Sequence, residues 1–358
     1  MKIEDLRAVM LDVPLKKAYS IASRDIRSAR LVLLEIRTKE GVYGYGSAAP
    51  CREVTGESPE DSLRELNSDG LKTLLIGRDP ISFLSLSDEL AGVLPDVPAA
   101  RAAVEIALLD CVGKHLGMPV YDILGCRVKP LPTSVTVGIC SPEETLRQVE
   151  EYRAAGFRFI KIKIGRSPEE DIERLIKIRE AFGNTLELRV DMNQGYTMED
   201  FRYFFQKTEQ FRLELLEQPF PVQQTHLVDL LEPSVKKILA ADENLQSPAD
   251  ALRLLQGPEK FGIFNIKLMK CGGPRDAARI ADLAALGGVK LMWGCNDESV
   301  LSITAALHSA LACPATAFLD LDGSFDLAED PCGGGFEVRE GILYPLSRPG
   351  YGVDVEIR

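Results

Sequence analysis

The stretch Phe159-Ile160-Lys161-Ile162-Lys163 has the pattern of a β-strand whose apolar run ends in a charged residue. Four later apolar runs end the same way, and the residues that close the five runs are Lys163, Asp191, Glu217, Asp242 and Lys267. Their spacings of 28, 26, 25 and 25 residues match the length of one strand–helix unit of an α/β barrel. In a (β/α)8 barrel the carboxyl ends of the strands surround one mouth, where active sites are built. The stretch and its repeats therefore predict a barrel enzyme.

The second half of the chain continues this alternation of strand and helix patterns. The expected barrel strands cover residues 133–139, 157–163, 186–191, 211–217, 236–242, 261–267, 288–293 and 315–320. Several amphipathic stretches between them open with Ser-Pro or Gly-Pro, which is typical of a helix start. We expect an α/β fold, with a modified (β/α)8 TIM barrel as the catalytic domain over residues 126–325.

The first third of the chain has a different pattern, in which strands come before helices. Strand patterns occupy residues 2–13 and 29–38, and residues 41–46 have the pattern of a turn followed by a third strand. Helix patterns occupy about 57–76, 80–91 and 98–117. This order indicates an N-terminal α+β capping domain over residues 1–125. The Gly- and Pro-rich segment over residues 326–358 is expected to return to that domain.

Composition narrows the class of protein. A chain of 358 residues that is 45% hydrophobic and 27% charged is typical of a globular enzyme. The net charge of -12 argues against nucleic acid or an anionic membrane surface as a partner. The eight cysteines are scattered without a Cys-x-x-Cys pair, and no apolar window approaches the length of a membrane span. We therefore expect a cytoplasmic protein that acts on a small molecule and is free to form a homo-oligomer.

Three of the strand-end residues are candidate metal ligands. Asp191, Glu217 and Asp242 offer hard carboxylate oxygens on neighbouring strands, which favours Mg²⁺ or Mn²⁺. The alternative is that each carboxylate caps the helix that follows it. Three such residues in consecutive strands favour the metal site.

The lysines at the strand ends are candidate acid–base groups. Lys161 and Lys163 are two residues apart and point to the same side of their strand, toward the barrel mouth. A lysine base needs a lowered pKa, which partial burial and a neighbouring cation supply. Lys267 lies across the mouth, whereas Lys270 is expected to be a loop charge.

A pair of aspartates closes the last barrel strand. Asp320 and Asp322 in Asp320-Leu321-Asp322-Gly323 are placed to hold an ammonium group or a second metal ion. The alternative is an Asx turn before Gly323. No Ser-His-Asp or Cys-His pattern is visible in the sequence.

These motifs together resemble the enolase superfamily, in its muconate-lactonizing subgroup. The resemblance rests on Lys-Ile-Lys at 161–163, Val-Asp-Met-Asn at 190–193, Glu-Gln-Pro at 217–219, Ala-Asp-Glu at 241–243 and Lys267. It covers nearly the whole chain. Within the subgroup the chain resembles the dipeptide epimerases, through Ala49-Pro50 with Val54-Thr55-Gly56-Glu57, Lys267-Leu268-Met269-Lys270, Gly294-Cys295 with Glu298-Ser299, and Asp320-Leu321-Asp322.

The resemblance implies an isomerase that moves a proton at the α-carbon of the C-terminal residue of a dipeptide. Asp191, Glu217 and Asp242 would hold a Mg²⁺ ion that binds the terminal carboxylate and stabilises an enolate. The best-known activity of the branch is L-Ala-D/L-Glu epimerisation, and other members act on hydrophobic or cationic dipeptides.

The remaining roles follow from the same resemblance. Lys161 would add positive charge to the enolate, and Lys163 and Lys267 would exchange the roles of base and conjugate acid. Asp320 and Asp322 would hold the α-ammonium group of the dipeptide. Capping segments around residues 16–28 and 50–57 would close over the substrate.

The residues expected around the substrate side chains are Arg24, Glu53, Thr136, Asn296 and Asp297. Arg24 would suit a glutamate side chain, whereas Glu53 and Asp297 would suit a lysine or arginine side chain. Asn296 stands where the branch usually carries Met. We favour basic side chains slightly over strict Ala-Glu specificity.

Other reactions on the same scaffold remain as alternatives. An o-succinylbenzoate synthase, an N-acylamino acid racemase or a muconate cycloisomerase would use the same metal ligands and lysines. The Asp320-Leu321-Asp322 motif argues against them, because their substrates carry no free ammonium group. A barrel that serves only as a binding or structural protein is disfavoured by the intact set of strand-end residues.

Overall fold

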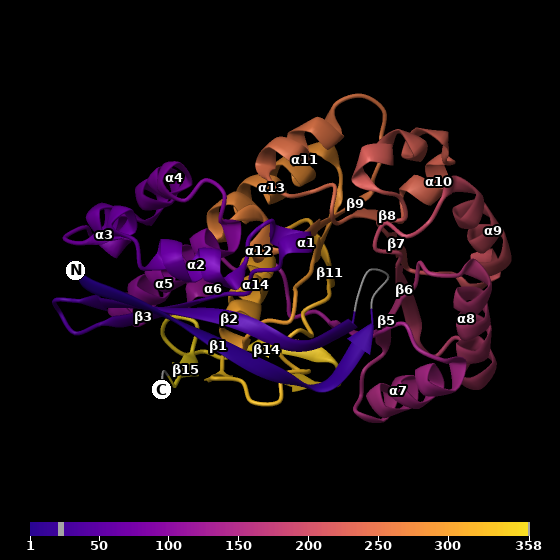
Figure 1. The fold of residues 1–358 in the computed structure, drawn as a ribbon, viewed down its shortest axis with the longest axis horizontal. Coiled ribbons are helices and arrows are strands. Elements are labelled where there is room, and N and C mark those ends of the chain that lie inside the picture. The colour runs from indigo at the N-terminus through magenta and orange to yellow at the C-terminus, as the bar shows by residue number, and fades with distance from the viewer. Residues whose placement is uncertain (21–24, 357–358) are drawn as a thin grey trace.

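The computed structural model describes residues 1–20 and 25–356, in which an eight-stranded parallel sheet lies beside a three-stranded antiparallel sheet (Figure 1). The parallel strands are β4 (Ser134–Val137), β5 (Phe159–Lys163), β6 (Glu187–Asp191), β7 (Leu215–Glu217), β8 (Leu239–Ala241), β9 (Ile263–Ile266), β10 (Lys290–Trp293) and β11 (Thr316–Leu319). They follow one another in sequence order across the sheet. The predicted α/β fold with a modified (β/α)8 barrel is confirmed.

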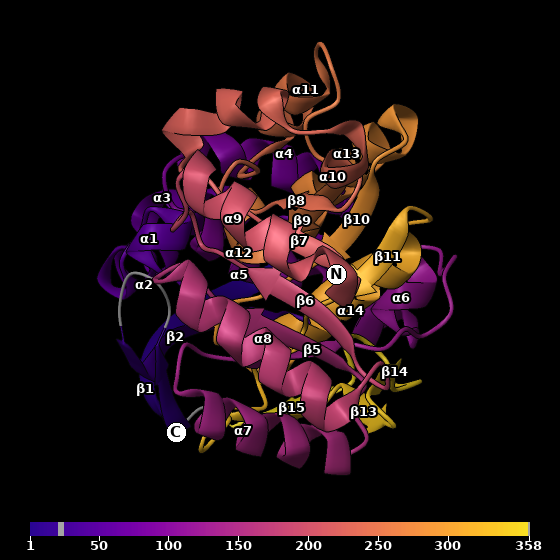
Figure 2. The same cartoon turned by 90° about the vertical axis from the view of Figure 1, so that its right-hand side faces the viewer.

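A helix lies in each connection between successive barrel strands. These helices are α7 (Pro142–Ala154), α8 (Pro168–Phe182), α9 (Met198–Thr208), η2 (Glu209–Phe211), η3 (Val222–Leu230), α10 (Pro233–Lys236), α11 (Pro248–Leu255), α12 (Leu268–Cys271), α13 (Pro274–Gly287) and α14 (Val300–Ala312). The Ser-Pro signals begin α7, α8 and α11, where Ser141, Ser167 and Ser247 each accept a hydrogen bond from a backbone N–H of the first turn. Figure 2 shows α7, α8 and α9 side by side over β5 and β6. They bury the outward-facing isoleucines of β5.

A buried arginine helps to close the barrel. The edge strands β4 and β11 meet through a single bridge between Thr133 and Leu319. Arg189 reaches from β6 into the barrel and donates to Leu319 O at 2.5 Å and to Ser134 Oγ at 3.0 Å. Its guanidinium also pairs with Glu214 at 2.6 Å. Side-chain bonds thus supplement the sparse backbone pairing at this edge.

The N-terminal residues form the antiparallel sheet and its covering helices. The elements are β1 (Ile3–Ser20), β2 (Asp25–Thr38), β3 (Tyr43–Ala48), α1 (Arg52–Thr55), α2 (Pro59–Leu66), α3 (Asp69–Leu75), η1 (Pro80–Ser82), α4 (Phe83–Val93), α5 (Pro98–Leu116) and α6 (Val120–Ile123). The β1–β2 hairpin runs from these helices to the barrel mouth, where Ile139 N donates to Ser20 O at 2.8 Å (Figure 1).

The C-terminal residues add short strands, and the chain there contacts the N-terminal helices. These strands are β12 (Cys332–Gly334), β13 (Phe336–Arg339), β14 (Ile342–Pro345) and β15 (Val353–Val355). Val120 N donates to Gly350 O at 2.9 Å, and Tyr351 N donates to Asp110 of α5 at 3.0 Å. The division into domains at residues 125 and 325 stays a prediction. Among the described residues, no helix is both long enough and apolar enough to cross a membrane.

The structure corrects three boundaries. The barrel strands begin later than expected, because residues such as Leu213 and Ile238 lie in the approach to a strand and not in its ladder. The helix expected over residues 57–76 is two helices, because Ser68 accepts a hydrogen bond from Leu71 N and starts a new one. The capping segment expected as a loop over residues 16–28 is largely strand, since β1 extends to Ser20 and β2 starts at Asp25.

Close packing of α5 on β3 generates a stability prediction. A Cβ atom at Gly46 would overlap the backbone carbonyl of Ala103 in α5. Since neither backbone can move without disturbing the core, Gly46→Ala should lower the free energy of unfolding by about 1–3 kcal/mol. Urea denaturation measures the change. Gly92→Ala in α4 is the control, since its Cβ would have no described atom within 4 Å, and a wild-type stability for Gly46→Ala would contradict the prediction.

Candidate functional site

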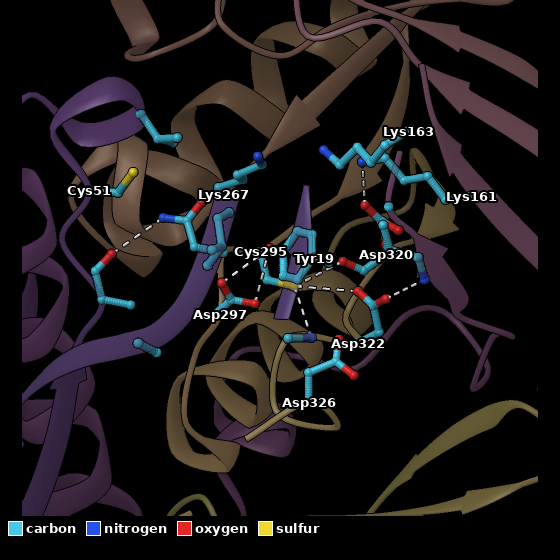
Figure 3. Close-up of a pocket in the computed structure, with 18 of the residues that line it drawn as sticks. Tyr19, Cys51, Lys161, Lys163, Lys267, Cys295, Asp297, Asp320, Asp322 and Asp326 are labelled. Atoms are coloured by element: carbon cyan, nitrogen blue, oxygen red, sulfur yellow. Dashed lines mark hydrogen bonds and ion pairs between the residues drawn. The ribbon is translucent and has the colours of Figure 1, made fainter. Parts of the chain in front are cut away.

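A pocket lies between the carboxyl ends of the barrel strands and the N-terminal hairpin. Its lining includes Tyr19, Ala49 and Cys51 from the N-terminal part and Lys163 and Lys267 from the barrel. Figure 3 shows the ammonium groups of Lys163 and Lys267 facing each other across one side of this pocket. The pocket is thus built from both parts of the chain.

Strand register brings the acidic residues together. The ladder pairs Lys163 with Asp191 and Asp191 with Glu217, so these residues form one row across β5, β6 and β7. Asp242 follows directly after β8. Ligand oxygens of Asp191, Glu217 and Asp242 all lie within 4.8 Å of one another, and the three residues are buried. The predicted carboxylate cluster is therefore present.

This cluster fits a hard divalent cation. Three buried carboxylate oxygens at this spacing suit the all-oxygen coordination of Mg²⁺, and their charge would be costly to bury without a cation. Asn265 Nδ2 donates to Glu217 Oε1 at 2.7 Å, which orients that carboxylate. The donor set therefore supports the metal site over the helix-cap alternative.

Lys161 lies at the centre of the charged groups. Its Nζ is 3.1 Å from Asp191 Oδ2, 2.8 Å from Glu217 Oε2 and 2.7 Å from Asp320 Oδ2. Burial opposes a charged lysine, but these carboxylates outweigh it and raise the pKa of Lys161 well above its usual value. Lys161 is thus a permanent cation.

The pKa values of the three carboxylates in the cluster are shifted in different directions. Burial opposes ionisation of Asp191, but Lys163 and Lys161 outweigh burial and lower the pKa of Asp191 to about 2. Burial and then the Asp191 charge raise the pKa of Glu217 to about 8. Asp242 has a pKa well below its usual value, because Lys267 and Lys270 outweigh the effect of burial. The different values follow from the different numbers of lysines in contact.

The structure corrects the expectation that Lys270 is a loop charge. Lys270 lies on the one-turn helix α12 and is buried. Its ammonium donates to Asp242 O at 2.7 Å, to Asn265 O at 3.1 Å and to the Asp242 carboxylate. Lys267 holds the other oxygen of that carboxylate at 2.9 Å. The one-turn helix after β9 turns the Lys270 side chain inward. The sequence around Lys270 has no helical periodicity that would predict this direction.

The aspartates after β11 face the same pocket. Asp320 is bound to Lys161 and accepts a hydrogen bond from Ser134 Oγ at 2.6 Å. Asp322 accepts one from Thr136 N at 2.6 Å, so Thr136 contacts the pocket and also orients Asp322. Burial, followed by the charges of Asp320 and Asp326, raises the pKa of Asp322 to about 7.

The residues expected around the substrate side chains divide into three groups. Asn296 and Asp297 line the pocket, and Asn296 Nδ2 donates to Ala49 O at 3.3 Å. Glu53 is exposed on α1, while its neighbours Cys51 and Val54 line the pocket. Arg24 lies outside the described residues.

Tyr19 and Asp326 are among the pocket residues that the sequence did not single out. Tyr19 lies near the end of β1, and its hydroxyl donates to the Asp297 carboxylate at 3.1 and 3.2 Å. Asp326 lines the pocket below Asp322 (Figure 3). Tyr19 lies on the hairpin, and the backbone of Asp326 is hydrogen-bonded to it through Lys16 N. No local sequence motif specifies where the hairpin meets the barrel.

Comparisons with known proteins agree with this geometry. Residues 5–125 match the family described as mandelate racemase / muconate lactonizing enzyme, N-terminal domain, and residues 144–358 match the family described as enolase C-terminal domain-like. The L-Lys-D/L-Arg epimerase of Methylococcus capsulatus is 46% identical over 353 residues, which are 99% of each chain. The L-Ala-D/L-Glu epimerase of Clostridium acetobutylicum is 34% identical over 356 residues, again 99% of each chain.

A solved structure is similar over the whole length. The crystal structure of the dipeptide epimerase from Methylococcus capsulatus, complexed with Mg and the dipeptide L-Arg-D-Lys, has a TM-score of 0.96 and 46% identity. The match covers 99% of both chains.

The carboxylate cluster generates a prediction about metal binding. Glu217→Gln replaces a charged ligand with a neutral one of the same shape, so the affinity for Mg²⁺ should fall by about 100-fold or more. Isothermal titration of the metal-free protein with Mg²⁺ measures it. Glu187→Gln, at the exposed amino end of β6, is the control and should bind like wild type. An unchanged Mg²⁺ affinity in Glu217→Gln would show that the cluster is not the metal site.

Proposed function

Because the chain belongs to the enolase superfamily and is a dipeptide epimerase of the muconate-lactonizing subgroup, we propose that its preferred substrates are dipeptides with cationic side chains. It is an isomerase, and the predicted magnesium cofactor is confirmed by the Mg complexes of its relatives together with the carboxylate cluster. The observation that carries the substrate proposal is a group of carboxylates, Asp297, Asp322 and Asp326, in the same pocket as Lys163 and Lys267.

We assign the metal to Asp191, Glu217 and Asp242. Mg²⁺ bound there supplies positive charge that holds the substrate's terminal carboxylate and stabilises the negative charge formed when the α-proton leaves. Lys161 adds a fixed cation beside this place, since its ammonium is buried against Asp191 and Glu217. The charges that would stabilise an enolate are therefore already in place before the α-proton leaves.

We assign the two proton transfers to Lys163 and Lys267. They extend from β5 and from the end of β9 and face each other across the pocket (Figure 3). A planar enolate between them presents one face to each lysine, so one removes the α-proton and the other delivers a proton to the opposite face. Each lysine is paired with a metal-ligand carboxylate, at 2.6 Å for Lys163 and 2.9 Å for Lys267. For Lys267, burial opposes the charged form, but the Asp242 carboxylate outweighs burial and raises the pKa of Lys267 well above its usual value.

The substrate's α-ammonium group is assigned to Asp320 and Asp322. Asp320 is already bound to Lys161, whereas Asp322 accepts hydrogen bonds from Thr136 N and from Cys295 Sγ. The raised pKa of Asp322 shows that its charge is poorly compensated. An ammonium group beside it would supply the missing cation.

Side-chain selectivity follows from the acids around Tyr19. The Tyr19 hydroxyl contacts Asp297, and burial, then Asp297, Asp322 and Asp326, raises the pKa of Tyr19 well above its usual value. An acidic substrate side chain here would face like charges, whereas a lysine or arginine side chain would be attracted. The relative from Methylococcus capsulatus, an L-Lys-D/L-Arg epimerase, supports the same substrate class.

We further propose that the protein works in the cytoplasm as a small-molecule enzyme. No disulfide joins any of the eight cysteines, which all lie in the described part of the chain, and this suits a reducing compartment. The net charge of -12 does not favour nucleic acid or an anionic membrane as a partner.

The Asp322 assignment predicts a pH dependence. Because Asp322 has a pKa of about 7, protonation below that pH removes the charge that pairs with ammonium, so kcat/KM for dipeptides should fall as the pH drops from 8 to about 6. Asp322→Asn should flatten this limb and lower kcat/KM by about 10- to 100-fold. N-acylated analogues are the control, since they carry no ammonium group. Equal losses for both substrate types would favour a reaction on N-acylated substrates.

The cationic preference is tested by comparing dipeptides. Dipeptides that contain Lys or Arg should have a kcat/KM at least about tenfold above that of L-Ala-L-Glu. Asp297→Asn should reduce this advantage by about tenfold and change kcat/KM for L-Ala-L-Ala by less than about threefold. Steady-state epimerisation assays measure both effects. A tenfold preference of the wild type for L-Ala-L-Glu would reject the proposal and direct attention to Arg24.

A further inference from the structure

Arg174 is a buried guanidinium outside the pocket. It lies on α8, which covers the outside of the barrel, and is 2% exposed. Its Nη1 donates to Lys163 O at 2.7 Å, its Nη2 to Gly138 O at 2.7 Å and its Nε to Thr145 Oγ1 at 2.9 Å. Asp171 is 3.7 Å away. A buried cation whose donors bind mainly neutral acceptors gains little stability from charge pairing. The main effect of Arg174 is therefore to hold the backbone carbonyls that it binds.

Arg174 and Asp171 hold the chain where β5 ends. Arg174 binds the carbonyl of Lys163, and Asp171 accepts a hydrogen bond from Gly165 N at 2.9 Å. Tyr196 donates to the same Asp171 oxygen at 2.9 Å. A Cβ at Gly165 would overlap the carbonyl of Met192, so the segment is also pressed against the end of β6. These contacts fix the backbone from which the Lys163 side chain extends.

We propose that Arg174 is a positioning residue for Lys163 and acts on only one of the two proton transfers. The inference rests on the proposed assignment of these transfers to Lys163 and Lys267. Lys267 lies on a different support, because its strand end is tied through Lys270 to Asp242 and Asn265. Loss of Arg174 therefore releases Lys163 and leaves the support of Lys267 in place.

The expected effect is large because proton transfer depends on geometry. A displacement of about 1 Å at a reacting group lowers a rate by about 100-fold. Arg174→Met keeps an unbranched, apolar stem but removes the guanidinium donors, so the Lys163 carbonyl loses its partner on α8. The exchange that Lys163 performs should slow by about 100-fold, while the exchange that Lys267 performs should change by less than about threefold.

The experiment measures exchange of the α-proton in D₂O, starting separately from each epimer of an L-Arg-Lys dipeptide. Lys163→Ala and Lys267→Ala first assign each epimer to its lysine, because each variant should lose exchange on one epimer only. Arg174→Met is then measured on both epimers with the Mg²⁺-loaded enzyme. If neither lysine variant gives a one-sided loss, the proposed lysine assignment fails, independently of Arg174.

A matched control lies on the same helix. Arg179 also donates to main-chain carbonyls, Gly183 O at 3.0 Å, Leu186 O at 2.8 Å and Phe211 O at 2.7 Å, but these precede β6 and β7 at the amino ends of the strands. Arg179→Met should lower stability without changing the ratio of the two exchange rates. Equal slowing of both epimers in Arg174→Met, or no slowing of either, would overturn the inference. Should Arg174→Met fail to fold, Arg174→Lys decides, with a smaller one-sided loss as the supporting result and an unchanged ratio as the opposing one.

Discussion

The contact of the buried Lys161 ammonium with the carboxylates of Asp191, Glu217 and Asp320 is the interaction on which the rest of the site depends. Buried carboxylates are costly unless a cation lies beside them, and the Lys161 ammonium is such a cation for all three. Lys161 joins strands β5, β6 and β7 to the segment after β11, so the same contact helps to hold the barrel closed. The Lys161 ammonium is thus part of what keeps the barrel mouth together.

The barrel and the N-terminal part contribute different residues to the pocket. The barrel strands supply the carboxylate cluster and the lysines, whose positions follow from strand register. The hairpin brings Tyr19 against Asp297, and Ala49 accepts a hydrogen bond from Asn296. Chemistry therefore lies on rigid strands, and side-chain selectivity lies where two parts of the chain meet. A change in the hairpin can alter the substrate without disturbing the proton transfers.

Hydrogen bonds outside the pocket fix the positions of the side chains that line it. Lys270 and Asn265 tie Asp242 to β9, and Arg174 with Asp171 ties the end of β5 to α8. These buried ions bind main-chain atoms as well as carboxylates, so they fix backbone positions and not only charges. Lys163 and Lys267, which face each other across the pocket, thereby have separate supports.

The sequence by itself indicated the barrel, the cluster of carboxylates, the lysines at the strand ends and the aspartates after the last strand. The charged residues stand at or just after the ends of apolar runs. Local periodicity with regular spacing is enough to place such residues at the mouth of a barrel. Only the tertiary structure decided that Tyr19 and Asp326 line the pocket, that Lys270 is buried against Asp242, that Glu53 is exposed, and that Arg174 holds Lys163. These positions depend on contacts between residues far apart in the chain, up to 278 positions for Tyr19 and Asp297, and no local pattern encodes which distant partner a side chain will meet.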